Sequence, residues 1–218
     1  MRGNITATPP RFDDTFRAAL RDLILWRRDV RRFKTDPVDA ALVLSLIELA
    51  ACSPSVGFSQ PWRFVLVENL ERREAIRASF ARANAEALST YSGERRGLYA
   101  KLKLEGLQAA PVQLAVFADE ETAAGAGLGS NTMPETRRYS VVGAIQTLWL
   151  AARANGLGVG WVSILEPDSV TAALDVPRTW RLVAYLCVGW PAEEHLDPEL
   201  QRHGWQERMD ANALILQR

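Results

Sequence analysis

The stretch RYSVVGAIQTLWLAARANGLGVGWVSIL, residues 138–165, decides the fold class. Its first part, Arg138 to Asn155, carries apolar residues at the spacing of an amphipathic helix. These residues are Val141, Ile145, Leu148, Trp149 and Ala152. Its second part, Leu157 to Leu165, is a nearly continuous apolar run that predicts a strand. Between them lie Gly156, Gly158 and Gly160. A dinucleotide-binding loop has its strand before the glycines and its helix after them. Because the order is reversed here, we interpret these glycines as a helix end and a tight turn.

The other elements add strands and helices in an irregular order. Further strands are expected over residues 61–67, 112–118 and 181–188. Helices are expected over 12–25, 70–88 and 98–107, with a short one from Pro167. Asp36 followed by Pro37 is typical of a helix start, and the helix predicted there, ending at Ala51, is apolar nearly all round and expected to be buried. Since helices and strands do not alternate strictly, the sequence predicts an α+β sandwich. We expect one domain over residues 1–218, with an N-terminal arm (1–11) and a C-terminal tail (189–218).

Composition excludes several classes of function. Lysine plus arginine equals aspartate plus glutamate at 26 each, so no overall field attracts nucleic acid or an anionic membrane. Residues 1–10 lack the apolar core of a signal peptide, and no apolar run is long enough to span a membrane. We therefore expect a cytoplasmic protein. Cys52 and Cys187 lie in apolar surroundings and are expected to be buried hydrophobic residues that form no disulfide.

Metal and hydrolase chemistry find no support. The two histidines, His195 and His203, lie in the tail without the spacing of metal ligands. The chain has no GxSxG elbow that would present a nucleophilic serine to either histidine. We therefore expect no metal site.

Trp26-Arg27-Arg28-Asp29-Val30-Arg31-Arg32-Phe33 is the richest candidate for chemistry. Arginine presents a fixed fork of donors that suits phosphate oxygens, and a carboxylate among guanidiniums stays ionised. The same cluster is also compatible with a solvated helix end that neutralises its own charge. Ser163, in the predicted strand GWVSIL, has two interpretations as well: a site residue, or a buried serine that only bonds the backbone.

Four segments together resemble the FMN-binding nitroreductase superfamily: RRDVRRF near residue 30, SPSVGFSQPWRF near 55, GLGVGWVSIL near 160 and VPRTWRLVAYLCVGWP near 180. The resemblance runs from residue 22 to about residue 208. It implies a nitroreductase-like α/β/α sandwich with a mainly antiparallel sheet. It also implies an intertwined homodimer that binds FMN at the subunit interface, with residues from both chains.

Three positions depart from ordinary nitroreductases: Asp29 replaces a small hydroxyl residue, Phe58 an asparagine, and Ser163 an acidic residue. With LKLEGLQAAPVQLAVF, GLGSNTMPETRRYSVVGAIQTLWLAAR and DPELQRHGW, these departures resemble the 5,6-dimethylbenzimidazole synthase family, BluB. Such enzymes consume reduced FMN with O2. They release dimethylbenzimidazole, the lower ligand of vitamin B12, and erythrose 4-phosphate. A sealed site would exclude NAD(P)H, so the resemblance implies a separate NAD(P)H-dependent flavin reductase as the supplier of FMNH2.

The resemblance also implies roles for individual residues. Arg27, Arg28 and Arg31 would hold the ribityl phosphate, with Arg202 of the tail as a further candidate, and which of these guanidiniums touch the phosphate is left open. Asp29 would be the base beside the ribityl chain, because C1′ has to be oxidised and its bond to C2′ broken. Ser163 would lie near flavin N5, and Tyr91 to Leu107 would form a lid. The expected flavin-binding residues are Arg27, Arg28, Asp29, Val30, Arg31, Ser163 and Arg202, with Pro54, Ser55, Val56 and Phe58 from the second subunit.

Three alternatives remain open for the function. The first is an ordinary NAD(P)H-dependent nitroreductase or flavin reductase. The second, of the same class, is a cob(II)yrinic acid a,c-diamide reductase. The third is a module that stores or senses FMN without catalysis.

Overall fold

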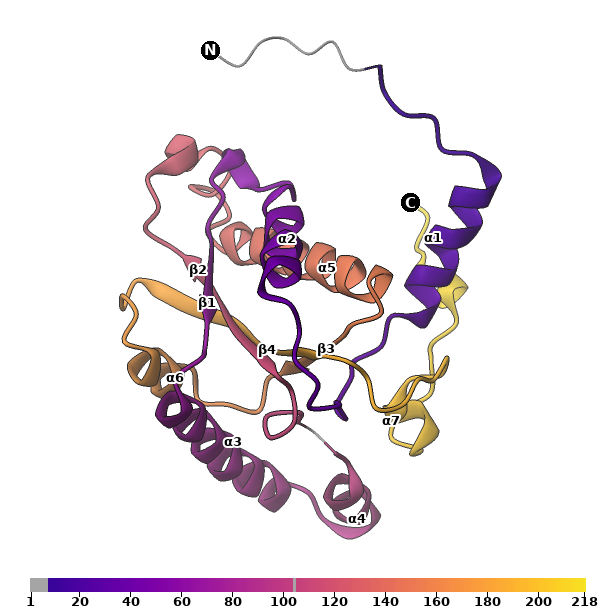
Figure 1. The fold of residues 1–218 in the computed structure, drawn as a ribbon, viewed down its shortest axis with the longest axis vertical. Helices are drawn as coiled ribbons and strands as arrows, with labels where there is room; N and C mark the ends of the chain where they lie inside the picture. Colours follow the sequence, from indigo (N-terminus) through magenta and orange to yellow (C-terminus); the bar gives the residue numbers. More distant parts are fainter. Residues whose placement is uncertain (1–7, 104) are drawn as a thin grey trace.

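The chain forms one antiparallel sheet of four strands with helices on both faces (Figure 1). The computed structural model describes residues 8–103 and 105–218. The strands are β1 (Trp62–Leu66), β2 (Val112–Asp119), β3 (Gly158–Val162) and β4 (Trp180–Gly189). Their order is β1-β2-β4-β3, and every neighbouring pair is antiparallel. The predicted α+β class and antiparallel sheet are therefore confirmed. Residues 1–7 of the expected arm, and Leu104 in the helix expected over 98–107, lie outside the described residues.

Alternation along β2 explains the layers of the sandwich. Leu114, Val116 and Ala118 face the core formed with α2 (Ala40–Ala51) and α5 (Thr136–Ala154). Ala115 and Phe117 face the opposite core, formed with α3 (Leu70–Thr90) and α6 (Pro167–Leu174). Successive side chains of a strand point to opposite faces, so a strand that is apolar throughout requires a cover on both sides.

The glycines after α5 have two different tasks. Gly156 ends the helix with φ 76°, as predicted. Gly158 and Gly160 lie inside β3, so the tight-turn interpretation is wrong for them. A Cβ atom on Gly160 would lie 2.1 Å from the carbonyl oxygen of Val30. Glycine is therefore required here because the segment around Val30 packs directly on the strand.

Several predicted boundaries are wrong. Helix α2 begins after Asp39, whose side chain accepts a hydrogen bond from the Ala41 amide at 2.9 Å, and not after Asp36. The helix expected over residues 98–107 begins earlier and ends earlier, as α4 (Gly93–Lys101). Cys187 is buried as expected, but Cys52 is exposed.

Two helices expose apolar surface in the single chain. Leu44 and Leu49 of α2 are 53% and 49% exposed, so the expectation that this helix is buried on all sides is wrong for one chain. Helix α1 (Asp14–Trp26) lies at the periphery in Figure 1, and none of its residues is buried.

The tail contains α7 (Glu199–Arg202) and a last short turn, η3 (Ala211–Leu214). Within residues 8–103 and 105–218, no helix is long and apolar enough to cross a membrane.

Candidate functional site

The arginine segment lies along β3, which is an edge strand of the sheet. The Val30 amide donates to the Val159 carbonyl at 3.0 Å, and Asp29 forms a parallel bridge with Val159. Both oxygens of Asp29 are engaged: Oδ1 accepts from the Trp161 amide at 2.9 Å, and Oδ2 accepts from Arg31 Nε at 2.9 Å. The carboxylate is thus fixed at the sheet edge by one main-chain and one charged donor.

The predicted phosphate arginines have different partners. Arg28 Nε donates to the Leu196 carbonyl at 2.8 Å, and its other nitrogens donate to the Arg27 and Leu25 carbonyls at 2.5 Å. It therefore caps the last turn of α1 and ties the tail to it. Arg31 bonds Asp29 and the Lys103 carbonyl, at 3.1 Å, and its side chain is only 12% exposed. Arg202 pairs with Asp197 at 3.1 Å.

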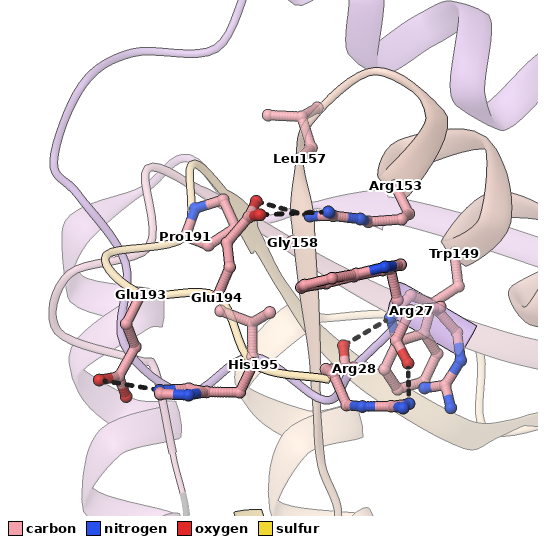
Figure 2. Close-up of a pocket in the computed structure, with 12 residues that line it drawn as sticks. Arg27, Arg28, Trp149, Arg153, Leu157, Gly158, Pro191, Glu193, Glu194 and His195 are labelled. Carbon is pink, nitrogen blue, oxygen red and sulfur yellow. Dashed lines mark hydrogen bonds and ion pairs between the residues drawn. The ribbon is translucent and has the colours of Figure 1, made fainter. Parts of the chain in front are cut away.

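The guanidinium of Arg27 differs, because no described residue hydrogen bonds to it. It lies 4.9 Å from the centre of the Trp149 ring (Figure 2). Burial is the largest effect on Arg27 and lowers its pKa; the negative charge of Asp29 raises the pKa, and the positive charge of Arg208, a smaller effect, lowers it. The pKa of Arg28 is lowered by burial, then by Arg27 and Arg208. The charged forms of Arg27 and Arg28 are thus disfavoured where they lie, and a bound anion would stabilise them.

Sequence reasoning missed Arg208. It named Arg202 as the tail residue, but the group that acts on Arg27 and Arg28 is Arg208, six positions further along. No local pattern in GWQERMD identifies it, because its relevance depends on how the tail folds back onto the arginine segment.

The cavities beside these arginines are small. One, of about 30 Å³, is lined by Arg27, Arg28 and Trp149 among others. The next, of about 40 Å³, lies between the arginine segment and the tail. Pockets for small organic ligands usually measure about 300–1,000 Å³. These cavities are therefore too small to enclose a large ring system in the single chain.

Ser163 lies just beyond β3, whose last residue is Val162, and it is exposed. The expectations that it lies within the strand and that it is buried are therefore wrong. It follows Trp161 by two residues, and the Trp161 amide holds Asp29. Ser163 thus lies two residues beyond the amide that holds the Asp29 carboxylate.

Pro54, Ser55, Val56 and Phe58 lie on the loop around η1 (Val56–Phe58), away from the arginine segment of the same chain. The Val56 amide bonds Ser140 Oγ near the start of α5, whereas Trp149, near its end, bonds the Arg28 carbonyl. The two contacts are about 13 Å apart along the helix axis at 1.5 Å per residue. Phe58 is 75% exposed. One chain therefore does not unite the two halves of the predicted site.

The predicted lid segment is anchored to the tail. Arg95 of α4 lies 4.3 Å from the centre of the Trp205 ring and donates to its carbonyl at 2.8 Å. Tyr91 and Tyr99 stack at 4.9 Å, and both rings contact Trp205. Within the described part of the chain, no three His, Cys, Asp or Glu side chains gather as a metal site would require.

Comparison with known proteins decides the family. The profile of the Nitroreductase family matches residues 24–190. A Rhodospirillum rubrum protein named 5,6-dimethylbenzimidazole synthase is 62% identical over 201 residues, which cover 92% of this chain and 95% of that protein. The chain belongs to the nitroreductase family, in the branch of the 5,6-dimethylbenzimidazole synthases.

Two further relatives agree with this placement. A Rhodobacter capsulatus protein of the same name is 46% identical and covers 91% of this chain and 96% of its own length. The crystal structure of an iodotyrosine deiodinase bound to FMN and 3-iodo-L-tyrosine is similar with a TM-score of 0.69 at 27% identity, covering 81% of this chain and 91% of that one. The nitroreductase match ends at residue 190, so the tail with Arg202 and Arg208 lies beyond it.

Proposed function

We propose that this protein is a 5,6-dimethylbenzimidazole synthase, which consumes reduced FMN and O2 and releases dimethylbenzimidazole and erythrose 4-phosphate. The observation that carries the proposal is the 62% identity, over 92% of the chain, to a protein of that name. The position of Asp29, fixed at the strand edge next to Arg27, whose guanidinium has no hydrogen-bond partner among the described residues, agrees with it.

The donors at the arginine segment fit a phosphate ester. Arg27 has a guanidinium without a hydrogen-bond partner among the described residues, and the charges of Arg28 and Arg208 act on it. We propose that Arg27 and Arg208 hold the ribityl phosphate, with Arg202 as a further ligand. Arg28 contributes its charge while its nitrogens bind backbone carbonyls. Reduced FMN supplies the electron-rich ring that reacts with O2 and the sugar carbon that enters the product.

Asp29 is the proposed base for the ribityl carbon. An ionised carboxylate has about four acceptor sites. The Trp161 amide and Arg31 engage one site on each oxygen, so both oxygens keep capacity to accept a proton. These two contacts fix the direction of the carboxylate, which is what proton removal from a weakly acidic carbon requires. Ser163, at the same end of β3, is proposed to hydrogen bond the edge of the ring.

The complete site requires a second copy of the chain. The apolar residues Phe16, Leu20 and Ile24 repeat every four positions along α1 and form a stripe that is 40–51% exposed among the described residues. An isolated helix of this length is marginal in water. We propose a homodimer in which α1 and α2 pack on the partner, and in which Pro54, Ser55, Val56 and Phe58 of the partner cover the flavin ring.

The proposal is tested by supplying chemically reduced FMN to the purified protein in air. Chromatography and mass spectrometry should detect dimethylbenzimidazole and erythrose 4-phosphate in equal amounts. A parallel anaerobic arm mixes the FMN-loaded protein with NAD(P)H. Rapid bleaching of the flavin without dimethylbenzimidazole formation in the first arm would identify an ordinary nitroreductase or flavin reductase instead. We propose that a separate flavin reductase supplies FMNH2 and that the reaction takes place in the cytoplasm.

A further inference from the structure

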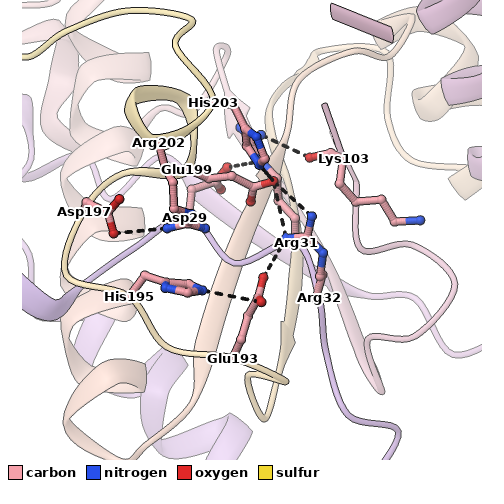
Figure 3. Close-up of polar contacts among 10 residues, drawn as sticks. All are labelled: Asp29, Arg31, Arg32, Lys103, Glu193, His195, Asp197, Glu199, Arg202 and His203. Atoms are coloured by element: carbon pink, nitrogen blue, oxygen red, sulfur yellow. Dashed lines mark hydrogen bonds and ion pairs between the residues drawn. The ribbon is translucent and has the colours of Figure 1, made fainter. Parts of the chain in front are cut away.

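Arg32 contacts the tail at two places, although no role was expected for it. Its carbonyl accepts from the Ala192 amide at 2.9 Å, where the chain leaves β4. Its side chain reaches Glu193 Oε1 at 2.6 Å and Glu199 Oε1 at 3.4 Å (Figure 3). The Glu199 side chain is only 10% exposed. One guanidinium therefore binds the start of the loop 193–198 and the first residue of the helix that follows it.

The loop is acidic and lies beside the proposed phosphate site. It carries Glu193, Glu194 and Asp197, and Glu199 follows directly. The cavity of about 40 Å³ between the tail and the arginine segment is lined by both kinds of charge, including Arg28, Arg31, Glu193 and Glu199. Carboxylates so placed repel a phosphate unless a cation neutralises them.

Each acid of the loop has a cationic partner. Arg153 pairs with Glu194 at 2.6 Å, and Arg202 with Asp197 at 3.1 Å. Glu193 also lies 3.4 Å from His195, and Glu199 lies 3.8 Å from His203, but a histidine carries a charge only when it is protonated. Arg32 is the permanently charged group that serves both carboxylates, so its loss uncovers more negative charge than the loss of Arg153 or Arg202. Its two partners also stand at opposite ends of the loop, so its loss frees the loop to move.

We propose that Arg32 is a positioning residue for the reduced flavin. It closes the acidic loop and neutralises Glu193 and Glu199, so that α7 and the following tail present Arg202 and Arg208 to the phosphate. Arg32 itself does not touch the phosphate. This inference rests on the proposed function, because it assumes that FMN phosphate binds beside the arginine segment.

The first test is the affinity of Arg32→Gln for FMN, measured by quenching of flavin fluorescence. We expect binding about tenfold weaker, because Glu193 and Glu199 then face the phosphate without their arginine partner. In turnover, KM for FMNH2 should rise while kcat stays near the wild-type value, the signature of a lost ground-state interaction. Arg32→Lys should recover part of the affinity. Arg77→Gln, which removes a surface pair with Glu74 on α3, is the matched control and should bind FMN normally.

A triple variant separates positioning from direct contact. Adding Glu193→Gln and Glu199→Gln to Arg32→Gln removes the repelling charges, so FMN affinity should return to within about threefold of wild type. If the triple variant binds FMN as weakly as Arg32→Gln, neutralisation of Glu193 and Glu199 does not explain the lost affinity, and the proposal is overturned. Wild-type affinity in Arg32→Gln would overturn it as well.

Hydrogen exchange without flavin tests whether Arg32 holds the tail in place, independently of the proposed function. The Trp205 amide bonds the Leu200 carbonyl at 2.8 Å and the Gly204 amide bonds the Gln201 carbonyl at 2.9 Å. Both amides should exchange faster in Arg32→Gln than in Arg77→Gln. Equal exchange rates in the two variants would contradict the proposal that Arg32 holds the tail in place. Failure of the wild type to bind FMN would instead overturn the proposed function. The exchange rates would then still decide whether Arg32 holds the tail in place.

Discussion

Asp29 is the side chain whose replacement should change the proposed chemistry most. In Asp29→Asn, the remaining carbonyl oxygen can still accept from the Trp161 amide, while the new amide nitrogen cannot accept from Arg31, and no base remains beside the ribityl chain. Loss of a positioned base costs about 10²–10⁴ in rate, so product formation should fall by that factor while FMN stays bound. Asp36→Asn, an exposed aspartate after the arginine segment, is the control and should be fully active. Near-normal rates of dimethylbenzimidazole formation in Asp29→Asn would remove Asp29 from the mechanism.

Ser163 should matter for turnover and not for stability. It is exposed, and replacement of such a side chain changes the free energy of unfolding by about 0.5 kcal/mol or less. Ser163→Ala should therefore melt within about 2 °C of wild type and form product more slowly. Thermal unfolding and product assays on the same sample check both statements. Ser169→Ala on α6 is the control, and equal product rates in the two variants would show that Ser163 does not act on the flavin.

The folded tail should depend on pH through its acidic residues. A hydrogen bond from Arg153 lowers the pKa of Glu194. Burial acts in the opposite direction on Glu193, but His195 and Arg32 outweigh it and lower its pKa. A carboxyl whose pKa is lowered by folding stabilises the fold above its unfolded pKa, about 4.3 for glutamate. That contribution disappears as the pH falls through the folded value.

We therefore expect the tail to detach in acid, below about pH 4. The amide resonance of Trp205, followed by NMR from pH 7 to pH 3, reports this because its bond to Leu200 lies within the tail. Glu194→Gln should make the folded tail less stable at pH 7, and the stability of the tail should then fall less between pH 7 and pH 3. A transition between pH 6 and 7 would contradict this prediction, because these two glutamates would then not control it.

Elements with a strong local signal could be predicted from the sequence. The apolar stripe of Arg138 to Asn155 gave the helix to within two residues, because the same positions that repeat in sequence are buried against the sheet. Asp36-Pro37 was misleading because Asp39 offers a competing cap only three residues later. The start of α4 at Gly93 could not be read locally, since this helix packs through Arg95 and Tyr99 on Trp205 of the distant tail.

Contacts between residues far apart in the sequence also limited what could be predicted of the candidate site. The sequence identified the arginine segment, because so many guanidiniums around one carboxylate is a dense local pattern. It could not distinguish Arg27 from Arg28, since Arg28 is occupied by the Leu196 carbonyl, 168 positions further along. Nor could it single out Arg32 or Arg208, whose partners come from the fold of the tail.

The whole molecule is proposed to work as a dimer, and α1 provides the test. Leu20 and Ile24 are 40% and 51% exposed in the single chain, although both are apolar. Leu20→Glu with Ile24→Glu should convert the dimer into a monomer of 24.2 kDa and abolish FMN retention. Leu70→Glu, at a leucine on α3 that is 77% exposed, is the matched control and should remain dimeric. Sedimentation velocity measures the masses. A wild type that sediments as a monomer while it holds FMN would contradict the shared site.

The fate of one carbon atom tests the account of the whole protein most directly. Cleavage between C1′ and C2′ of the ribityl chain leaves C1′ with the ring and sends the other four carbons to erythrose 4-phosphate. The purified protein is mixed in air with reduced FMN that carries ¹³C at C1′, and the products are analysed by mass spectrometry. We predict dimethylbenzimidazole that contains the label and erythrose 4-phosphate that does not. Complete recovery of the label in intact, reoxidised FMN would contradict the proposal that this protein consumes its flavin.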